Sequence, residues 1–89
     1  MLERTEVSME KDITIAVHIE EDEATTTVHT VLDLMGDNFE ARGRAKRNPG
    51  DQAMPVIGEE LALARALNGL QTKVMEAAQT KIGEFLGEE

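Results

Sequence analysis

The sequence predicts an α+β domain in which a three-stranded antiparallel meander precedes one long C-terminal helix. Two observations lead to this fold class. Between residues 12 and 47 apolar side chains alternate with polar or small ones, which is the period of half-buried strands. From residue 55 onward apolar side chains recur every three or four positions, the period of a helix that buries one face. One change of period therefore divides the chain into a sheet and a helix.

The first two strands are expected over residues 12–20 and 25–34. In the first, isoleucine and valine occupy every second position, and the second is rich in β-branched residues. A tight hairpin turn at residues 22–23 would join them. Partners would then have numbers that sum to 45, as for Val17 and Val28. The apolar side chains of both strands would share one face.

A second hairpin is expected at residues 36–37, because its glycine accepts a positive φ without a Cβ clash. Partners would sum to 73, so that Leu34 would lie opposite Phe39 and the apolar face would continue across three strands. The third strand would end at Arg47, because the turn cluster at residues 48–51 contains a proline that removes a ladder donor.

The apolar face of the third strand carries the small residues Ala41, Gly43 and Ala45, which leave room for a helix to approach closely. We therefore predict that Gly43 is structural. The helix would begin at Pro55, where a helix start tolerates proline. Roughly 30 residues at about 1.5 Å each span about 45 Å, more than a small domain. The helix is thus expected either to break near Gly69 or to project beyond its sheet.

Composition predicts an association between copies. The chain has 89 residues, two phenylalanines, no tryptophan or tyrosine and no cysteine. Domains this small bury only about 60% of their unfolded surface, and here no disulfide or cysteine-based metal site adds stability. We therefore expect a homodimer, in which a second copy supplies the missing burial.

We expect residues 1–10 to form a flexible N-terminus and residues 11–89 to form a single domain. The first residues contain no apolar run of the length that a signal peptide or a membrane span needs. The expected location is therefore the cytoplasm, with no membrane partner.

The residue types that carry catalysis are sparse. Ser8 is the only serine, there is no cysteine, and the carboxylates gather in turns and termini, so we predict no enzymatic activity, no catalytic residues and no cofactor. His18 and His29 would lie diagonally on the polar face of the sheet, within reach of a bridging cation. No third ligand has a fixed place beside them, so surface histidines are expected rather than a metal site.

Charge is distributed unevenly over a chain whose formal net charge is −9. Its one basic cluster consists of Arg42, Arg44, Lys46 and Arg47, of which the first three alternate along a strand and would share a face. Such a cluster could follow a phosphate backbone. The net charge repels nucleic acid, and no tryptophan or tyrosine could stack on bases. A solvated strand face, a protein partner and the ribosome all stay open, whereas naked nucleic acid is disfavoured.

A resemblance to a known family covers most of the chain, from about residue 13 to residue 82. Its specific part is the run Arg47-Asn48-Pro49, Asp51 and the segment 55–70. On these residues the chain resembles an actinobacterial family of small dsRBD-like domains of unknown function. The resemblance implies a three-stranded sheet backed by a helix. Through the mycobacterial members it also implies a symmetric dimer whose outline is similar to a ribosome hibernation promoting factor.

Two functions of different classes remain. One is a non-enzymatic dimeric interaction protein, with the resemblance suggesting a stress- or dormancy-linked regulator. The other is a ribosome or RNA binder that uses the basic cluster. Double-stranded RNA-binding domains place lysines at the start of their last helix, where this chain has Glu59 and Glu60; those carboxylates suit the positive end of a helix dipole instead. Salt dependence would separate the two functions, because phosphate contacts release counterions.

Overall fold

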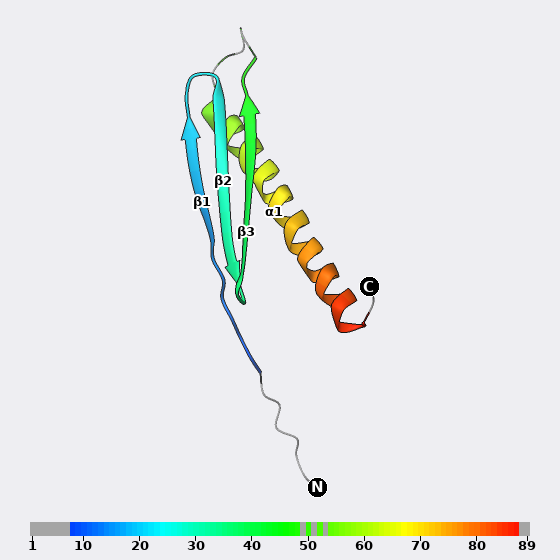
Figure 1. Ribbon diagram of the computed structural model, residues 1–89. Helices are drawn as coiled ribbons and strands as arrows, with labels where there is room; N and C mark the ends of the chain where they lie inside the picture. The colour runs from blue at the N-terminus through cyan, green and yellow to red at the C-terminus, as the bar shows by residue number, and fades with distance from the viewer. Residues whose placement is uncertain (1–7, 49, 51, 53, 88–89) are drawn as a thin grey trace.

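A computed structural model describes residues 8–48, 50, 52 and 54–87. Three strands form one antiparallel sheet in chain order, and a single helix lies across one of its faces (Figure 1). The elements are β1 (Ile15–Glu21), β2 (Thr25–Leu34), β3 (Asp37–Lys46) and α1 (Pro55–Phe85). The predicted fold class is confirmed. No helix of the described segments is both long and apolar enough to cross a membrane.

The helix is continuous, so the alternative of a break near Gly69 is wrong. α1 runs over 31 residues, and its C-terminal turns lead away from the strands (Figure 1). Ile82 and Phe85 near its end are 58% and 89% exposed. The other alternative, a helix longer than its sheet can cover, describes what is observed.

The limits of the strands agree closely with the pattern of the sequence. β2 has the predicted bounds, whereas β1 starts and ends later than the expected 12–20, and β3 stops one residue before Arg47. The predicted flexible N-terminus falls mostly outside the described residues, as does part of the turn cluster at 48–51.

The register of both hairpins differs from the prediction by two residues. Partners in β1 and β2 sum to 47, so Val17 lies opposite Thr30. Partners in β2 and β3 sum to 71, so Leu32 lies opposite Phe39. A shift by two preserves which side chains share a face, because the side-chain period of a strand is two. The predicted faces are therefore correct although the predicted partners are wrong.

The β2–β3 turn explains one of the two shifts. Its central residues are Met35 and Gly36, with φ of 51° and 89°, rather than residues 36–37. Positive φ at both central positions is the signature of a type I′ turn, whose twist matches that of the flanking strands. Methionine in this conformation has no distinctive sequence signal, so the turn was predicted one residue too late.

The β1–β2 turn is shifted in the opposite direction, one residue later than predicted, by Asp22. Its carboxylate Oδ1 accepts hydrogen bonds from the backbone N–H groups of Ala24 and Thr25, at 2.8 and 2.7 Å. Its own N–H donates to the carbonyl of Thr25 at 2.9 Å. Asp22 therefore closes the turn instead of occupying its centre, which Glu23 and Ala24 take.

α1 packs against β2 and β3 through small side chains. Ala62 and Ala66 are fully buried, and they form a cluster with Val28 and Ala45. Opposite them lies Gly43, where an added Cβ would overlap the backbone of both alanines and approach the carbonyl carbon of Arg65 to 3.0 Å. Helix and strand backbones are thus in contact at Gly43, as the structural role predicted for it requires.

One helix covers only two of the three strands. On β1 the side chains of Ile15, Val17 and Ile19 point to the helix side, yet they are 37%, 44% and 40% exposed. Their partners on β2, among them Thr30 and Leu32, are buried. A helix is about 10 Å wide and strands are about 4.8 Å apart, so the apolar side chains of the third strand lie beside the helix rather than beneath it.

Candidate partner-binding face

The face of the sheet opposite α1 carries the cations of β3. Arg42, Arg44 and Lys46 alternate along this strand with the buried positions and are all exposed, so they line one face as the alternation predicts. We call these three residues the basic stripe. Among the described residues none forms a hydrogen bond or an ion pair with their side-chain nitrogens.

Arg47, the fourth member of the predicted cluster, has a different role. Its backbone N–H donates to the carbonyl of Ala24 at 2.8 Å, and its Nε donates to the carbonyl of Glu23 at 3.2 Å. Both bonds hold the β1–β2 turn against the end of β3. Arg47 lies next to the basic stripe in the sequence, but its hydrogen bonds stabilise the β1–β2 turn.

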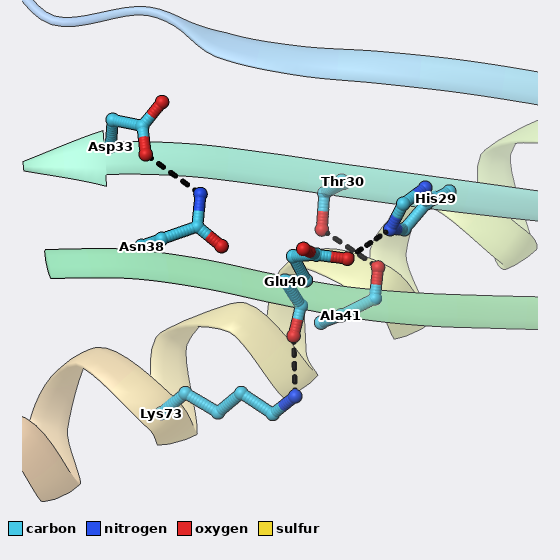
Figure 2. Close-up of polar contacts among 7 residues, drawn as sticks. All are labelled: His29, Thr30, Asp33, Asn38, Glu40, Ala41 and Lys73. Carbon is cyan, nitrogen blue, oxygen red and sulfur yellow. Dashed lines mark hydrogen bonds and ion pairs between the residues drawn. The ribbon is translucent and has the colours of Figure 1, made fainter.

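The two histidines lie beside the basic stripe in one row across the sheet. His18 is directly opposite His29, and His29 is directly opposite Arg42, so the predicted diagonal placement is wrong for the same reason as the register. His29 Nε2 lies 2.9 Å from Glu40 Oε1 (Figure 2), and His18 Nε2 lies 3.3 Å from Glu20 Oε2.

No group of three or more histidine, cysteine or acidic side chains that could hold a metal ion occurs in the described part of the chain. Each histidine instead hydrogen bonds to one carboxylate on an exposed face. This arrangement places a polar, mixed-charge surface next to the basic stripe.

The backbone beneath the basic stripe is held by the helix. Arg65 donates from a guanidinium N–H to the carbonyl of Arg44 at 2.6 Å, and Lys73 Nζ donates to the carbonyl of Glu40 (Figure 2). Eight residues span about 12 Å on a helix, and four residues span about 13 Å on a strand. The spacing of Arg65 and Lys73 along the helix therefore matches the spacing of the two carbonyls that they bind on the free edge of β3.

These edge contacts were not predicted from the sequence. The spacing of Arg65 and Lys73 on the helix was a usable signal only once the helix was known to cross β3. Two further bonds across β2 and β3 fix the strand pair: Thr30 Oγ1 donates to the carbonyl of Ala41 at 3.0 Å, and Asn38 Nδ2 donates to Asp33 Oδ1 at 2.7 Å (Figure 2).

The pKa values of two carboxylates near the β1–β2 turn, Asp22 and Glu59, are shifted in opposite directions. The backbone N–H groups of Ala24 and Thr25, and more weakly the charge of Arg44, hold the pKa of Asp22 below its usual value. In contrast, the neighbouring carboxylate of Glu21 raises the pKa of Glu59 through its charge and a hydrogen bond.

The carboxylate of Glu59, which was expected to favour the start of the helix, is thus repelled by the carboxylate of Glu21 on β1. The first turn of α1 contains no acidic side chain, and Glu59 lies in the second turn, beyond the range at which the helix dipole acts strongly.

A depression of about 660 Å³ opens where the β1–β2 turn, the end of β3 and the start of α1 meet. Its apolar lining includes Ala45, Ile57 and Leu61, and Glu21 and Lys46 are among its charged residues. Every buried side-chain nitrogen and oxygen of the described residues has a hydrogen-bond partner. No buried polar side chain is therefore left unpaired to orient a small molecule in the depression, and Lys46, which lines it, belongs to the basic stripe, so the basic stripe is the better candidate for recognition.

These observations define a class of protein: a small α+β domain in which one helix backs a three-stranded meander whose polar outer face bears a basic stripe. The chain belongs to the Rv2632c-like family, whose model matches residues 11–89. That match includes the whole sheet and the helix.

Two relatives of the chain are mycobacterial proteins. The uncharacterized protein Rv2632c of Mycobacterium tuberculosis (strain ATCC 25618 / H37Rv) is 33% identical over 72 residues, which cover 81% of this chain and 77% of that protein. The uncharacterized protein MT1780 of M. tuberculosis (strain CDC 1551 / Oshkosh) is 32% identical over 65 residues, covering 73% of this chain and 69% of that protein. Neither name states an activity or a partner.

The crystal structure of Rv2632c has a similar fold. It superposes with a TM-score of 0.84 at 29% sequence identity, and the match covers 92% of this chain and 98% of that chain. The arrangement of sheet and helix is therefore shared with a solved member of the family.

Proposed function

We propose that this chain is a non-enzymatic, homodimeric interaction protein of the cytoplasm that binds an acidic surface of a protein partner through the basic stripe. The observation that carries the proposal is the state of Arg42, Arg44 and Lys46: three exposed cations, without side-chain partners among the described residues, on a chain of net charge −9. The regulatory setting we propose is stress or dormancy, by analogy with ribosome hibernation factors.

The use of the other cations supports this choice. Arg65 and Lys73 bind backbone carbonyls of β3, and Lys81 Nζ forms an ion pair with Asp37 at 2.6 Å. Those side chains bond to other parts of the fold, whereas within the basic stripe only the charge of Arg44 acts on the chain itself, as the weakest of the influences on Asp22. Unpaired cations can form charge-assisted hydrogen bonds with carboxylates without first breaking a contact within the chain.

A purely catalytic role has less support. A general base or nucleophile needs a positioned partner and exclusion of water. His18 and Glu20 are largely exposed, and His29 hydrogen bonds to a half-exposed carboxylate on the same open face. These pairs orient the imidazoles on the surface next to the basic stripe, where they can add polar contacts to a partner.

Binding to ribosomal RNA is the second candidate function, and the alternation of the basic stripe favours it. Three cations on one strand face can contact successive phosphates, and phosphate contacts position a nucleic acid without reading its sequence. Three such contacts predict a slope of log affinity against log salt of only about −3 on duplex nucleic acid.

The test measures fluorescence anisotropy with two probes, an acidic glutamate-rich peptide and a ribosomal RNA fragment. The variant Arg42→Glu with Arg44→Glu should lose binding of the acidic peptide. The control Arg4→Glu with Lys11→Glu changes the net charge by the same amount outside the basic stripe and should keep binding. If the RNA fragment binds and the peptide does not, the second function replaces the first. If neither probe binds at low salt, both fall.

A further inference from the structure

The two free edges of the sheet are unlike. On the β3 edge, Arg65 and Lys73 reach over from α1 and occupy the carbonyls of Arg44 and Glu40. On the β1 edge, no described residue outside β2 hydrogen bonds to the strand backbone. Exposed edges present unpaired N–H and C=O groups that template pairing with another strand. Only β3 is protected from this.

The groups that β1 offers can be identified from the ladder. Asp22 N–H bonds to Thr25 directly after the strand, so the even-numbered residues of β1 direct their backbone groups to β2. Because these directions alternate in an antiparallel ladder, Ile15, Val17 and Ile19 direct their N–H and C=O groups to the free edge. The unpaired backbone thus belongs to the same three residues as the exposed apolar side chains.

Those side chains are continuous with an apolar furrow between β1 and α1. The furrow has a volume of about 370 Å³, and its lining includes Ile15, Leu67, Val74 and Met75. Leu67 and Met75 are 38% and 48% exposed. A strand added at the β1 edge would therefore gain backbone hydrogen bonds and apolar contact at once.

We propose that the occupant of this edge is β1 of a second copy, paired antiparallel about a two-fold axis at Val17. The pairing rests on the homodimer of the proposed function and gives it a geometry. Residue numbers of partners sum to 34, so Val17 meets Val17 of the partner subunit, and Ile15 meets Ile19 of the partner subunit. The product is one continuous six-stranded sheet with both helices on the same face.

The sequence of β1 is complementary to itself in this register. All three exposed apolar side chains meet apolar side chains, and residues with outward-facing backbone groups meet each other, as the ladder requires. Glu20 and Glu21 lie opposite Thr14 and Ile13 of the other copy. The two acidic strand ends are thus separated by eight residues, roughly 26 Å.

Charges beyond the strand are consistent with the same choice. Asp12 lies opposite Asp22 of the other copy, but this like-charged pair lies past the strand ends, where water screens it. A register that brought the acidic turns together would bring the residues Glu20, Glu21, Asp22 and Glu23 of both copies side by side. The strand therefore favours its own antiparallel copy over a parallel one.

Two proline variants test the edge. Val17→Pro removes an N–H that points to the β1 edge, and Arg42→Pro removes one that points to the β3 edge, so neither breaks an intrachain ladder bond. Val17→Pro should weaken dimerisation at least about 30-fold, the effect of losing two net hydrogen bonds across the axis. Arg42→Pro should leave the dimer intact. Circular dichroism checks that both variants fold, and sedimentation equilibrium gives the mass.

Single cysteines test the register, because the chain has no native cysteine. Residues in a hydrogen-bonded pair have Cα atoms about 5.5 Å apart, within the range of a disulfide. Val17→Cys should therefore give a covalent dimer on mild oxidation. Ile15→Cys alone should not, since two copies of residue 15 would lie four residues apart, roughly 13 Å. The double variant Ile15→Cys with Ile19→Cys should form the covalent dimer again.

The outcomes separate this proposal from the homodimer itself. A wild-type protein that is monomeric at every concentration overturns both. A dimer that resists Val17→Pro, and whose Val17→Cys variant forms no intersubunit disulfide, overturns the β1 pairing and leaves the homodimer in place. A dimer that Arg42→Pro dissociates assigns the interface to β3 and also overturns the pairing.

Discussion

Gly43 sets the closest approach between the sheet and the helix. It faces Ala62 and Ala66, and the backbone of α1 occupies the space that its side chain would need. The residue could be predicted because it interrupts a run of alanines on the buried face of a strand, where a glycine has no propensity advantage. What the sequence could not tell is that the obstacle is backbone, which cannot rotate away.

We predict that Gly43→Ala lowers the free energy of unfolding by about 1–3 kcal/mol or more, because even one methyl group overpacks this contact. Gly83→Ala is the matched control. It lies in α1 with nothing within 4 Å of an added Cβ, so it should stabilise the helix by about 1 kcal/mol at most. Urea denaturation measures both. Equal midpoints for the Gly43 variant and the wild type would show that helix and strand are not in contact there.

Glu59 provides a pH-dependent prediction. The neighbouring Glu21 raises its pKa in the folded chain, so the folded state holds this proton more tightly than the unfolded state. The associated stability is present below the unfolded value near 4.5 and is lost as pH rises through the raised pKa. A charge on Glu59 is thus opposed by the neighbouring carboxylate of Glu21 in the folded chain.

Glu59→Gln should therefore raise the melting temperature at pH 7, and the difference from wild type should shrink as the pH falls towards 4.5. Thermal melts followed by circular dichroism between pH 4 and pH 7 measure it. Glu60→Gln is the control on the same turn, with the same change of charge. A Glu59 variant that melts below the wild type at pH 7 would refute the repulsion.

Among the elements, the strands and the helix were predictable because the periods of their apolar residues are clear. The side chains that share each face of the sheet were also predictable, because a register shift of two residues leaves every side chain on the same face. The register was not, since it depends on turn chemistry. Asp22 moves one turn by capping it through its side chain, and Met35 moves the other by adopting a positive φ. The capping of the β3 edge by Arg65 and Lys73 depends on where the helix crosses, which no local pattern encodes.

That capping leads to a prediction about association. Arg65→Met with Lys73→Met would free the carbonyls of Arg44 and Glu40 and expose a second pairing edge. We expect the double variant to associate beyond the dimer at raised concentration, as measured by light scattering. Lys81→Met is the control, because that cation pairs with a side chain, Asp37, rather than with an edge carbonyl. A double variant whose mass stays constant would mean that the two cations do not protect the edge.

For the whole molecule, one helix of 31 residues and three strands leave apolar surface that a single copy does not cover. Composition predicted this shortage, but the sequence did not reveal which strand is left uncovered. Pairing through β1 would also place the two basic stripes on one continuous outer face. They would lie five strand spacings apart, about 24 Å, so that one acidic partner could contact both. The candidate site and the dimer would then form one surface.

The mass of the native protein in solution tests this account most directly. Sedimentation equilibrium over micromolar concentrations should give twice the 9.8 kDa mass of the chain. The Val17→Pro variant should shift towards the mass of a single chain over the same range, with its circular dichroism spectrum unchanged. A wild-type protein that remains a folded monomer of 9.8 kDa throughout that range would contradict the central claim.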